Sequence, residues 1–128
     1  FVAIGDVTGD GLADLIFGGG PGGGPRVRIA DAAQVLAAGN FGTLDNILGA
    51  VVANFFAGSD ALRGGGRVAA HDLDGDGLSE LITGSGDATL SEVRIYDSAA
   101  ILSSPSSPSP ETVFDPFGAV IPGGVFVG

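Results

Sequence analysis

The sequence predicts an all-β fold built from a short unit that occurs twice. Residues 2–36 align without a gap on residues 68–102 when the chain is shifted by 66 positions. The apolar runs are short and bounded by glycine, as in strands that end in tight turns. The 24 glycines lack the three-residue period of collagen, which favours a turn-rich β protein. A duplicated supersecondary unit accounts for these three observations together.

Each copy of the unit is expected to hold four short strands. They are residues 2–4, 15–17, 26–30 and 51–56 in the first copy, and 68–70, 81–83, 92–96 and 113–117 in the second. Four-stranded units that recur at a fixed period are typical of β-propeller blades. We therefore expect two blades, at residues 1–62 and 63–128, with the C-terminal segment completing a blade.

The copies differ between their third and fourth strands. The first copy has Asp31 to Leu36, which suits a single helical turn. The second has the proline- and serine-rich tract 103–110, whose composition is typical of an exposed, extended loop. We expect this region to be a surface that tolerates changes in length.

The strongest functional signal is an acidic loop between the first two strands of each copy. It reads Asp-Val-Thr-Gly-Asp-Gly-Leu-Ala-Asp in the first copy and Asp-Leu-Asp-Gly-Asp-Gly-Leu-Ser-Glu in the second. Oxygen-bearing side chains at positions 1, 3, 5 and 9 suit a hard cation that takes six to eight oxygen ligands, and calcium is the natural candidate. The predicted ligands are the side chains of Asp6, Thr8, Asp10 and Asp14 with the Leu12 carbonyl, and those of Asp72, Asp74, Asp76 and Glu80 with the Leu78 carbonyl. We expect two calcium ions per chain, with the weaker site in the first loop because Thr8 is uncharged.

Two other interpretations fit these loops less well. An EF-hand needs a glutamate at its twelfth loop position, where this chain has Phe17 and Thr83, and its flanking helices are not predicted here. An Asp-Gly hairpin turn forms without an ion. Two nine-residue loops with carboxylates in the same phase are harder to explain in that way, and their acids would repel each other without a cation.

These residues resemble the FG-GAP repeats of integrin-type and bacterial β-propellers, in the variety that also carries VCBS-like repeats. The resemblance spans nearly the whole chain, and its most specific parts are Ile4–Pro21 and Val68–Gly84. It implies a calcium ion in each loop, held at the positions given above. The chain departs from the family pattern at Thr8, where aspartate or asparagine is usual, at Glu80, where aspartate is usual, and after Gly84, where the glycine-proline run is missing.

Composition limits the partners and the location. The net charge is −10, seven of the fifteen acids lie in the two loops, and the five arginines are scattered, so nucleic acid is not an expected partner. The chain has no cysteine and no long apolar run, which leaves no disulfide framework and no membrane span to expect. Loops of this kind suit millimolar calcium, so we expect an extracellular protein, either secreted or on the cell surface.

The expected function is that of a non-catalytic scaffold or adhesion module that binds a protein or carbohydrate ligand. The alternative is a blade segment of a larger secreted enzyme or carbohydrate-binding protein. The segment Pro122–Gly128 resembles the entry to the second unit, and two blades cannot close a ring. We therefore expect a homo-oligomer, or neighbouring blades in a longer chain. Arg28 and Arg94, which recur at one phase, are expected to bond carbonyls between blades.

Overall fold

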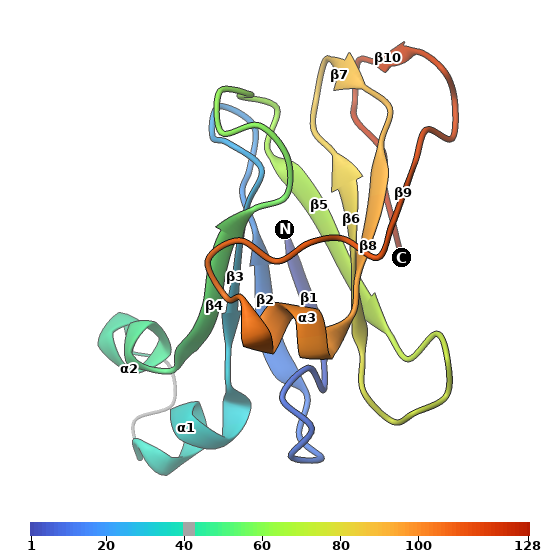
Figure 1. The fold of residues 1–128 in the computed structure, drawn as a ribbon. Helices are drawn as coiled ribbons and strands as arrows, with labels where there is room; N and C mark the ends of the chain where they lie inside the picture. Colours follow the sequence, from blue (N-terminus) through green and yellow to red (C-terminus); the bar gives the residue numbers. More distant parts are fainter. Residues whose placement is uncertain (40–42) are drawn as a thin grey trace.

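The chain forms two four-stranded antiparallel sheets that pack against each other (Figure 1). The structure is a computed structural model and describes residues 1–39 and 43–128. The first sheet contains β1 (Val2–Gly5), β2 (Asp14–Gly18), β3 (Arg26–Ala30) and β4 (Val51–Phe56), and the second contains β5 (Gly66–His71), β6 (Glu80–Ser85), β8 (Val93–Tyr96) and β9 (Thr112–Phe114). The fold is thus mostly β and antiparallel, as predicted. Within the described residues, the sheets close neither a barrel nor a propeller.

The two sheets have the same strand order and nearly the same register. The strands follow one another as β1-β2-β3-β4 and as β5-β6-β8-β9. Leu15 pairs with Ala30 in the first sheet, and Leu81 pairs with Tyr96 in the second, 66 positions later in each case. The strand predictions agree with the observed bounds to within three residues, and the last predicted strand differs most, because β9 ends at Phe114.

Short helices follow the third strand of each sheet. They are α1 (Ala32–Ala37) and α3 (Ser98–Ser103), and each begins after an aspartate. Asp31 accepts a hydrogen bond from the backbone N–H of Gln34 at 3.1 Å, and Asp97 accepts one from Ala100 at 3.0 Å. These N-caps satisfy backbone donors that have no partner inside the helix. The helix α1 was expected, whereas α3 and a further helix, α2 (Leu44–Gly49), were not predicted.

The main core lies between the two sheets. Ile16, Ile29 and Phe55 of the first sheet pack with Leu81 and Tyr96 of the second. The rings of Phe55 and Tyr96 lie 5.3 Å apart, centre to centre. Because the facing strands alternate inward and outward side chains, one face of each sheet is apolar, and the burial of these two faces holds the second sheet against the first.

The proline- and serine-rich tract does more than cover the surface. It runs from α3 across to the outer edge of β4 before returning to β9 (Figure 1). There the backbone N–H of Asn54 donates to the Pro105 carbonyl at 2.8 Å, and Pro108 is buried. The tract therefore joins the two sheets and protects the edge of β4, which limits how freely its length can change.

A small two-stranded sheet of β7 (Thr89–Leu90) and β10 (Val120–Ile121) was not predicted. It lies at the end of the molecule opposite the acidic loops (Figure 1). None of the helices in residues 1–39 and 43–128 has the length and apolar character that crossing a membrane requires.

Candidate metal centre

Each acidic loop is organised by the aspartate that opens it. Asp72 accepts hydrogen bonds from the backbone N–H groups of Gly75 at 2.7 Å and Gly77 at 3.0 Å. Asp6 accepts the corresponding bonds from Gly9 at 2.7 Å and Gly11 at 2.8 Å. One carboxylate thus holds the turn of the loop in both places.

The glycines are required by the backbone itself. Gly75 and Gly77 have φ angles of +84° and +92°, and Gly9 and Gly11 have +80° and +83°. Residues other than glycine rarely adopt this left-handed backbone conformation. The alternating glycines let the chain coil tightly while the intervening side chains remain free to point to a common centre.

The acid that closes each loop lies at the start of the following strand and is buried. Glu80 begins β6, and its Oε2 accepts a bond from the Leu73 N–H at 2.7 Å. Asp14 begins β2, and its Oδ2 accepts a bond from the Val7 N–H at 3.0 Å. These contacts anchor the loop ends to the sheets.

The second loop brings three of its predicted ligands together. Asp72, Asp74 and Glu80 each present a carboxylate oxygen, and these oxygens lie within 4.8 Å of one another. Among the described residues, this is the one group of three or more acids, histidines or cysteines that converges in this way. Asp76 lies outside the group, and its Oδ1 accepts a bond from the N–H of Leu78 at 2.8 Å.

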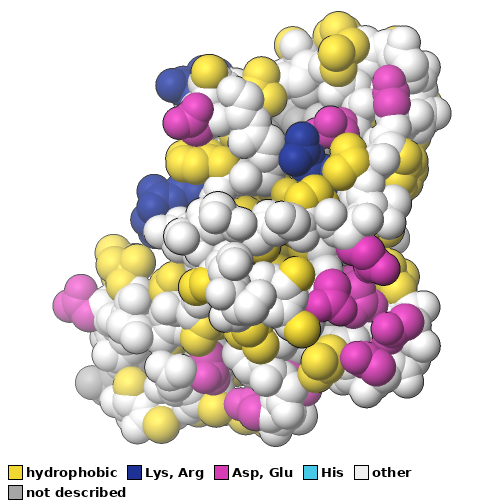
Figure 2. All heavy atoms as spheres, in the orientation of Figure 1, with side chains coloured by type: hydrophobic (Ala, Val, Ile, Leu, Met, Phe, Trp, Pro, Cys, Tyr) yellow, Lys and Arg dark blue, Asp and Glu magenta, His cyan; other side chains and the backbone are white. Residues whose placement is uncertain are grey.

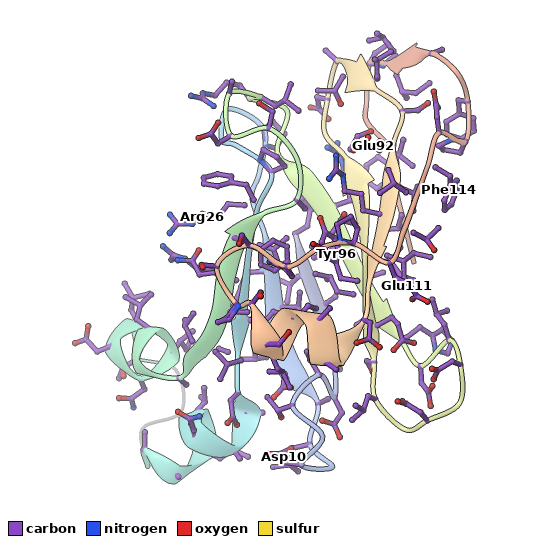
Figure 3. All side chains as sticks on the ribbon, in the orientation of Figure 1. Asp10, Arg26, Glu92, Tyr96, Glu111 and Phe114 are labelled. Atoms are coloured by element: carbon purple, nitrogen blue, oxygen red, sulfur yellow. The ribbon has the colours of Figure 1, made fainter. Side chains whose placement is uncertain are left out.

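The first loop is arranged differently around its closing acid. Asp14 accepts bonds from the N–H groups of Thr8 at 2.9 Å and Ala32 at 3.1 Å, in addition to that of Val7. The Thr8 hydroxyl lies 3.5 Å from Asp14 Oδ1. Asp14 is therefore already used in holding the loop and α1. Asp10 lies at the far tip of the loop (Figure 3), where it accepts a bond from the N–H of Leu12 at 2.8 Å. The acids Asp6, Asp10 and Asp14 do not converge on a common point in the described structure.

The chemistry of the second loop fits a cation. The ion pairs among the described residues are Arg67–Asp87 and Arg94–Glu92, and neither involves a loop acid. Acidic side chains gather over this end of the molecule without a basic one among them (Figure 2). Three converging carboxylates without a positive side chain repel one another unless a cation lies between them.

The two loops touch each other. The backbone N–H of Ser79, next to Glu80, donates to the carbonyl of Asp6 at 2.7 Å. A Cβ at Gly5 would overlap the Ser79 side chain, so the two chains approach closely at this point. An ion that orders one loop therefore also stabilises the contact with the other.

Sequence reasoning missed the arginine with the most contacts. Arg67 is 4 % exposed and donates to the carbonyl of Gly123 at 2.6 Å and to that of Gly64 at 3.3 Å. It also pairs with Asp87, and its guanidinium lies 4.7 Å from the ring centre of Phe1 and 4.8 Å from that of Phe126. The sequence around Arg67 gave no signal of these contacts, because Gly123, Phe1 and Phe126 are all more than 50 residues away from it.

Arg94, which we expected to bond a carbonyl, instead contacts the Glu92 carboxylate, with 2.6 Å between Arg94 Nε and Glu92 Oε1.

No family model, no curated protein and no solved structure matches the chain.

Proposed function

We propose that this chain is a calcium-binding, non-catalytic module of the β-propeller type that serves outside the cell as a scaffold or interaction surface. The observation that carries the proposal is the convergence of Asp72, Asp74 and Glu80 without a basic partner. Carboxylate oxygens gathered on a glycine-shaped loop are the ligands that calcium prefers. Asp76 and the Leu78 carbonyl lie next to this group in the chain and would complete the set.

Calcium would act here as a staple for the fold. The unfolded chain has no preformed site, so the free energy of binding adds to the free energy of unfolding by RT ln(1 + [Ca]/Kd). The site joins the end of β5 to the start of β6, and the Ser79–Asp6 contact passes the effect to the first sheet. Asp74 is exposed and Asp72 is half-buried, which suits an ion that exchanges with a calcium-rich solution.

We propose a second, weaker site in the first loop, at Asp6, Thr8, Asp10 and Asp14 with the Leu12 carbonyl. The recurrence of the hydrogen bonds of the opening aspartate supports this site. The neutral Thr8 and the hydrogen-bonded Asp14 both reduce the negative charge available to an ion. Binding there requires Asp10 to turn inward.

The two sheets would be neighbouring blades of a larger arrangement, formed by copies of this chain or by further blades. Val2 and Ile4 of β1 are 66 % and 62 % exposed, whereas Val68, which is 66 residues after Val2, is 7 % exposed because the first sheet covers it. A similar sheet placed over β1 would bury Val2 and Ile4 in the same way. Light scattering after size exclusion, in calcium and in chelator, tests whether copies of this chain supply that sheet.

Calcium titration by calorimetry tests the central proposal. The wild-type chain should bind calcium at two sites of unequal affinity, and Asp74→Asn should abolish the tighter one. Asp60→Asn is the matched control, because it removes the same charge from an exposed position outside the loops. Asp60→Asn should leave both sites intact.

Thermal unfolding provides a second readout. Calcium should raise the Tm of the wild-type chain and of Asp60→Asn, and should raise that of Asp74→Asn much less. A wild-type chain that takes up no calcium at millimolar concentration would exclude the staple. If Asp74→Asn and Asp60→Asn lost the calcium-induced rise in Tm to the same extent, the effect of calcium would depend only on the net charge of the chain.

A further inference from the structure

A pocket of about 460 Å³ opens between the two sheets, near the end of the molecule opposite the acidic loops. One wall comes from the turns that flank the first sheet and includes Pro25, Ala57 and Leu62. The other wall comes from β6 and β8 of the second sheet and from the segment 86–92 between them. Figure 2 shows a hollow in the upper half of the molecule with a basic side chain beside an acidic one, and Figure 3 shows Glu92 at this place.

The pocket exists because the second sheet has small polar residues on the face that meets the first sheet. Thr83 and Ser85 lie on this face of β6 and line the pocket. The residue 66 positions before Thr83 is Phe17, whose side chain packs against a second apolar cluster. A threonine in place of a phenylalanine leaves space that a side chain of the first sheet does not fill.

One wall carries a closed ion pair. Arg94 lies on β8 and Glu92 directly precedes this strand, with Arg94 Nε donating to Glu92 Oε1 at 2.6 Å. Their side chains are part-buried and both line the pocket. The pair therefore presents donors and acceptors to the pocket while adding no net charge to it.

The Thr83 hydroxyl belongs to the lining of the pocket. Thr83 is 3 % exposed, and its hydroxyl has no hydrogen-bond partner among the described residues, but its oxygen is still reached by solvent, since Arg67 Nε is the buried side-chain atom left without a partner in this part of the chain. A ligand that displaces solvent from the pocket must therefore supply a hydrogen bond to this hydroxyl in its place.

We propose that this pocket binds a small uncharged polyol of the size of a mono- or disaccharide. Its volume falls within the roughly 300–1,000 Å³ of small-molecule sites. A hydroxyl group can donate to Glu92 and accept from Arg94, and a neighbouring hydroxyl can reach Thr83. The C–H face of the ligand would lie on Pro25 and Leu62. The carboxylate of Glu92 and the net charge of −10 would repel an anion. The guanidinium of Arg94 would repel a cation.

Saturation-transfer NMR with a panel of D-glucose, D-galactose, D-mannose, N-acetyl-D-glucosamine, maltose and lactose tests the proposal on the full chain. At least one of these sugars should receive saturation from the protein, and D-glucuronate should receive less than D-glucose. Thr83→Val keeps the shape of the side chain and should lower the affinity for that sugar by about 2- to 10-fold, the effect of one neutral hydrogen bond. Thr83→Phe should abolish the signal by filling the pocket.

Thr112→Val is the matched control, because Thr112 is exposed on β9 and does not line the pocket. Its sugar binding should equal that of the wild type. The proposal is overturned if no sugar in the panel binds, if glucuronate binds better than glucose, or if Thr83→Val binds as tightly as Thr112→Val. The last comparison does not depend on whether Thr83→Phe folds. The calcium proposal stands or falls separately, because the pocket and the acidic loops share no residue.

Discussion

The carbonyl oxygen of Val125 lies so close to Gly84 that any side chain at position 84 would overlap it. The backbone N–H of Val125 also donates to the carbonyl of Ser85 at 2.9 Å. The C-terminal segment is therefore held against β6 by its backbone.

The same relationship occurs between the two sheets. The carbonyl of Gly66 lies against Gly18 in the same way, and the N–H of Gly66 donates to the carbonyl of Gly19 at 2.9 Å. Gly18 and Gly19 precede Gly84 and Ser85 by 66 positions. The segment around Val125 thus contacts the second sheet as the start of β5 contacts the first. This supports the proposal that each sheet is a blade followed by the start of another.

Gly84→Ala should destabilise the chain by about 1–3 kcal/mol, since overpacking forces the backbone apart. Gly20→Ala is the matched control, because a Cβ there meets no atom within 4 Å. Urea unfolding measures both. Equal stability of the two variants would show that the C-terminal segment moves away at no cost.

The strands of the two four-stranded sheets and the helix α1 could be predicted because their signals are local. Asp31 lies directly before α1, and the apolar runs bounded by glycine became strands. The helix α3 after Asp97 was not predicted, although the same type of N-cap precedes it. The acidic loops were recognised from spacing alone. Spacing did not reveal that Asp14 is occupied by hydrogen bonds to Val7, Thr8 and Ala32, because Ala32 lies 18 residues away and its approach depends on how β3 pairs with β2.

The features that were missed depend on contacts between distant segments. The guanidinium of Arg67 contacts the rings of Phe1 and Phe126, at opposite ends of the chain, and no local sequence pattern predicts such a contact. The pocket arises from a difference between the copies, Thr83 in place of Phe17, which is easy to pass over when similarity is sought. The carbonyl of Pro105 accepts a hydrogen bond from β4. Every residue has a backbone carbonyl, so the composition of the tract does not predict this bond.

Arg67→Lys should cost about 1.5–3 kcal/mol, the contribution of one hydrogen bond to a charged group, because an ammonium cannot reproduce the fork that reaches both Gly123 and Asp87. Arg28→Lys is the control, since Arg28 makes no side-chain bond in the described structure. The free energy of unfolding of each variant decides the matter. Similar values would mean that the two aromatic rings accept either cation equally.

Thr8→Asp should raise the calcium affinity of the first loop and lower the stability of the chain in chelator. The new carboxylate would lie near Asp14, whose Oδ1 is 3.5 Å from the Thr8 hydroxyl, and two like charges at this distance repel by about 1 kcal/mol in water. Thr8→Asn separates charge from shape. Calorimetry with calcium and urea unfolding in chelator should show opposite effects for Thr8→Asp and little change for Thr8→Asn. A loss of stability in both conditions would argue against an ion in this loop.

Tyr96 offers a pH-dependent test of the core between the sheets. Burial raises the pKa of its phenol, the charge of Arg94 lowers it, and Glu92 raises it further, with a net upward shift. The folded chain therefore keeps the proton at a pH where the unfolded chain, with a pKa of about 10, releases it. This contribution to stability is complete below pH of about 10 and is lost as the pH rises through the folded pKa, by at most about 1.4 kcal/mol per pH unit.

Tyr96→Phe should remove that alkaline loss of stability and cost about 1 kcal/mol at neutral pH through the missing hydroxyl contact with Arg94. The phenolate signal comes from one residue, because Tyr96 is the single tyrosine, and the chain has neither cysteine nor lysine. Phenolate absorbance of the wild-type chain then reports the pKa of this one group directly, beside urea midpoints of both chains from pH 8 to 11. If the phenolate formed with the pKa of free tyrosine, Tyr96 would be in contact with solvent, which would contradict its position in the core. Burial and the nearby Glu92 both disfavour the charged phenolate, so a buried Tyr96 must ionise at a higher pH than free tyrosine.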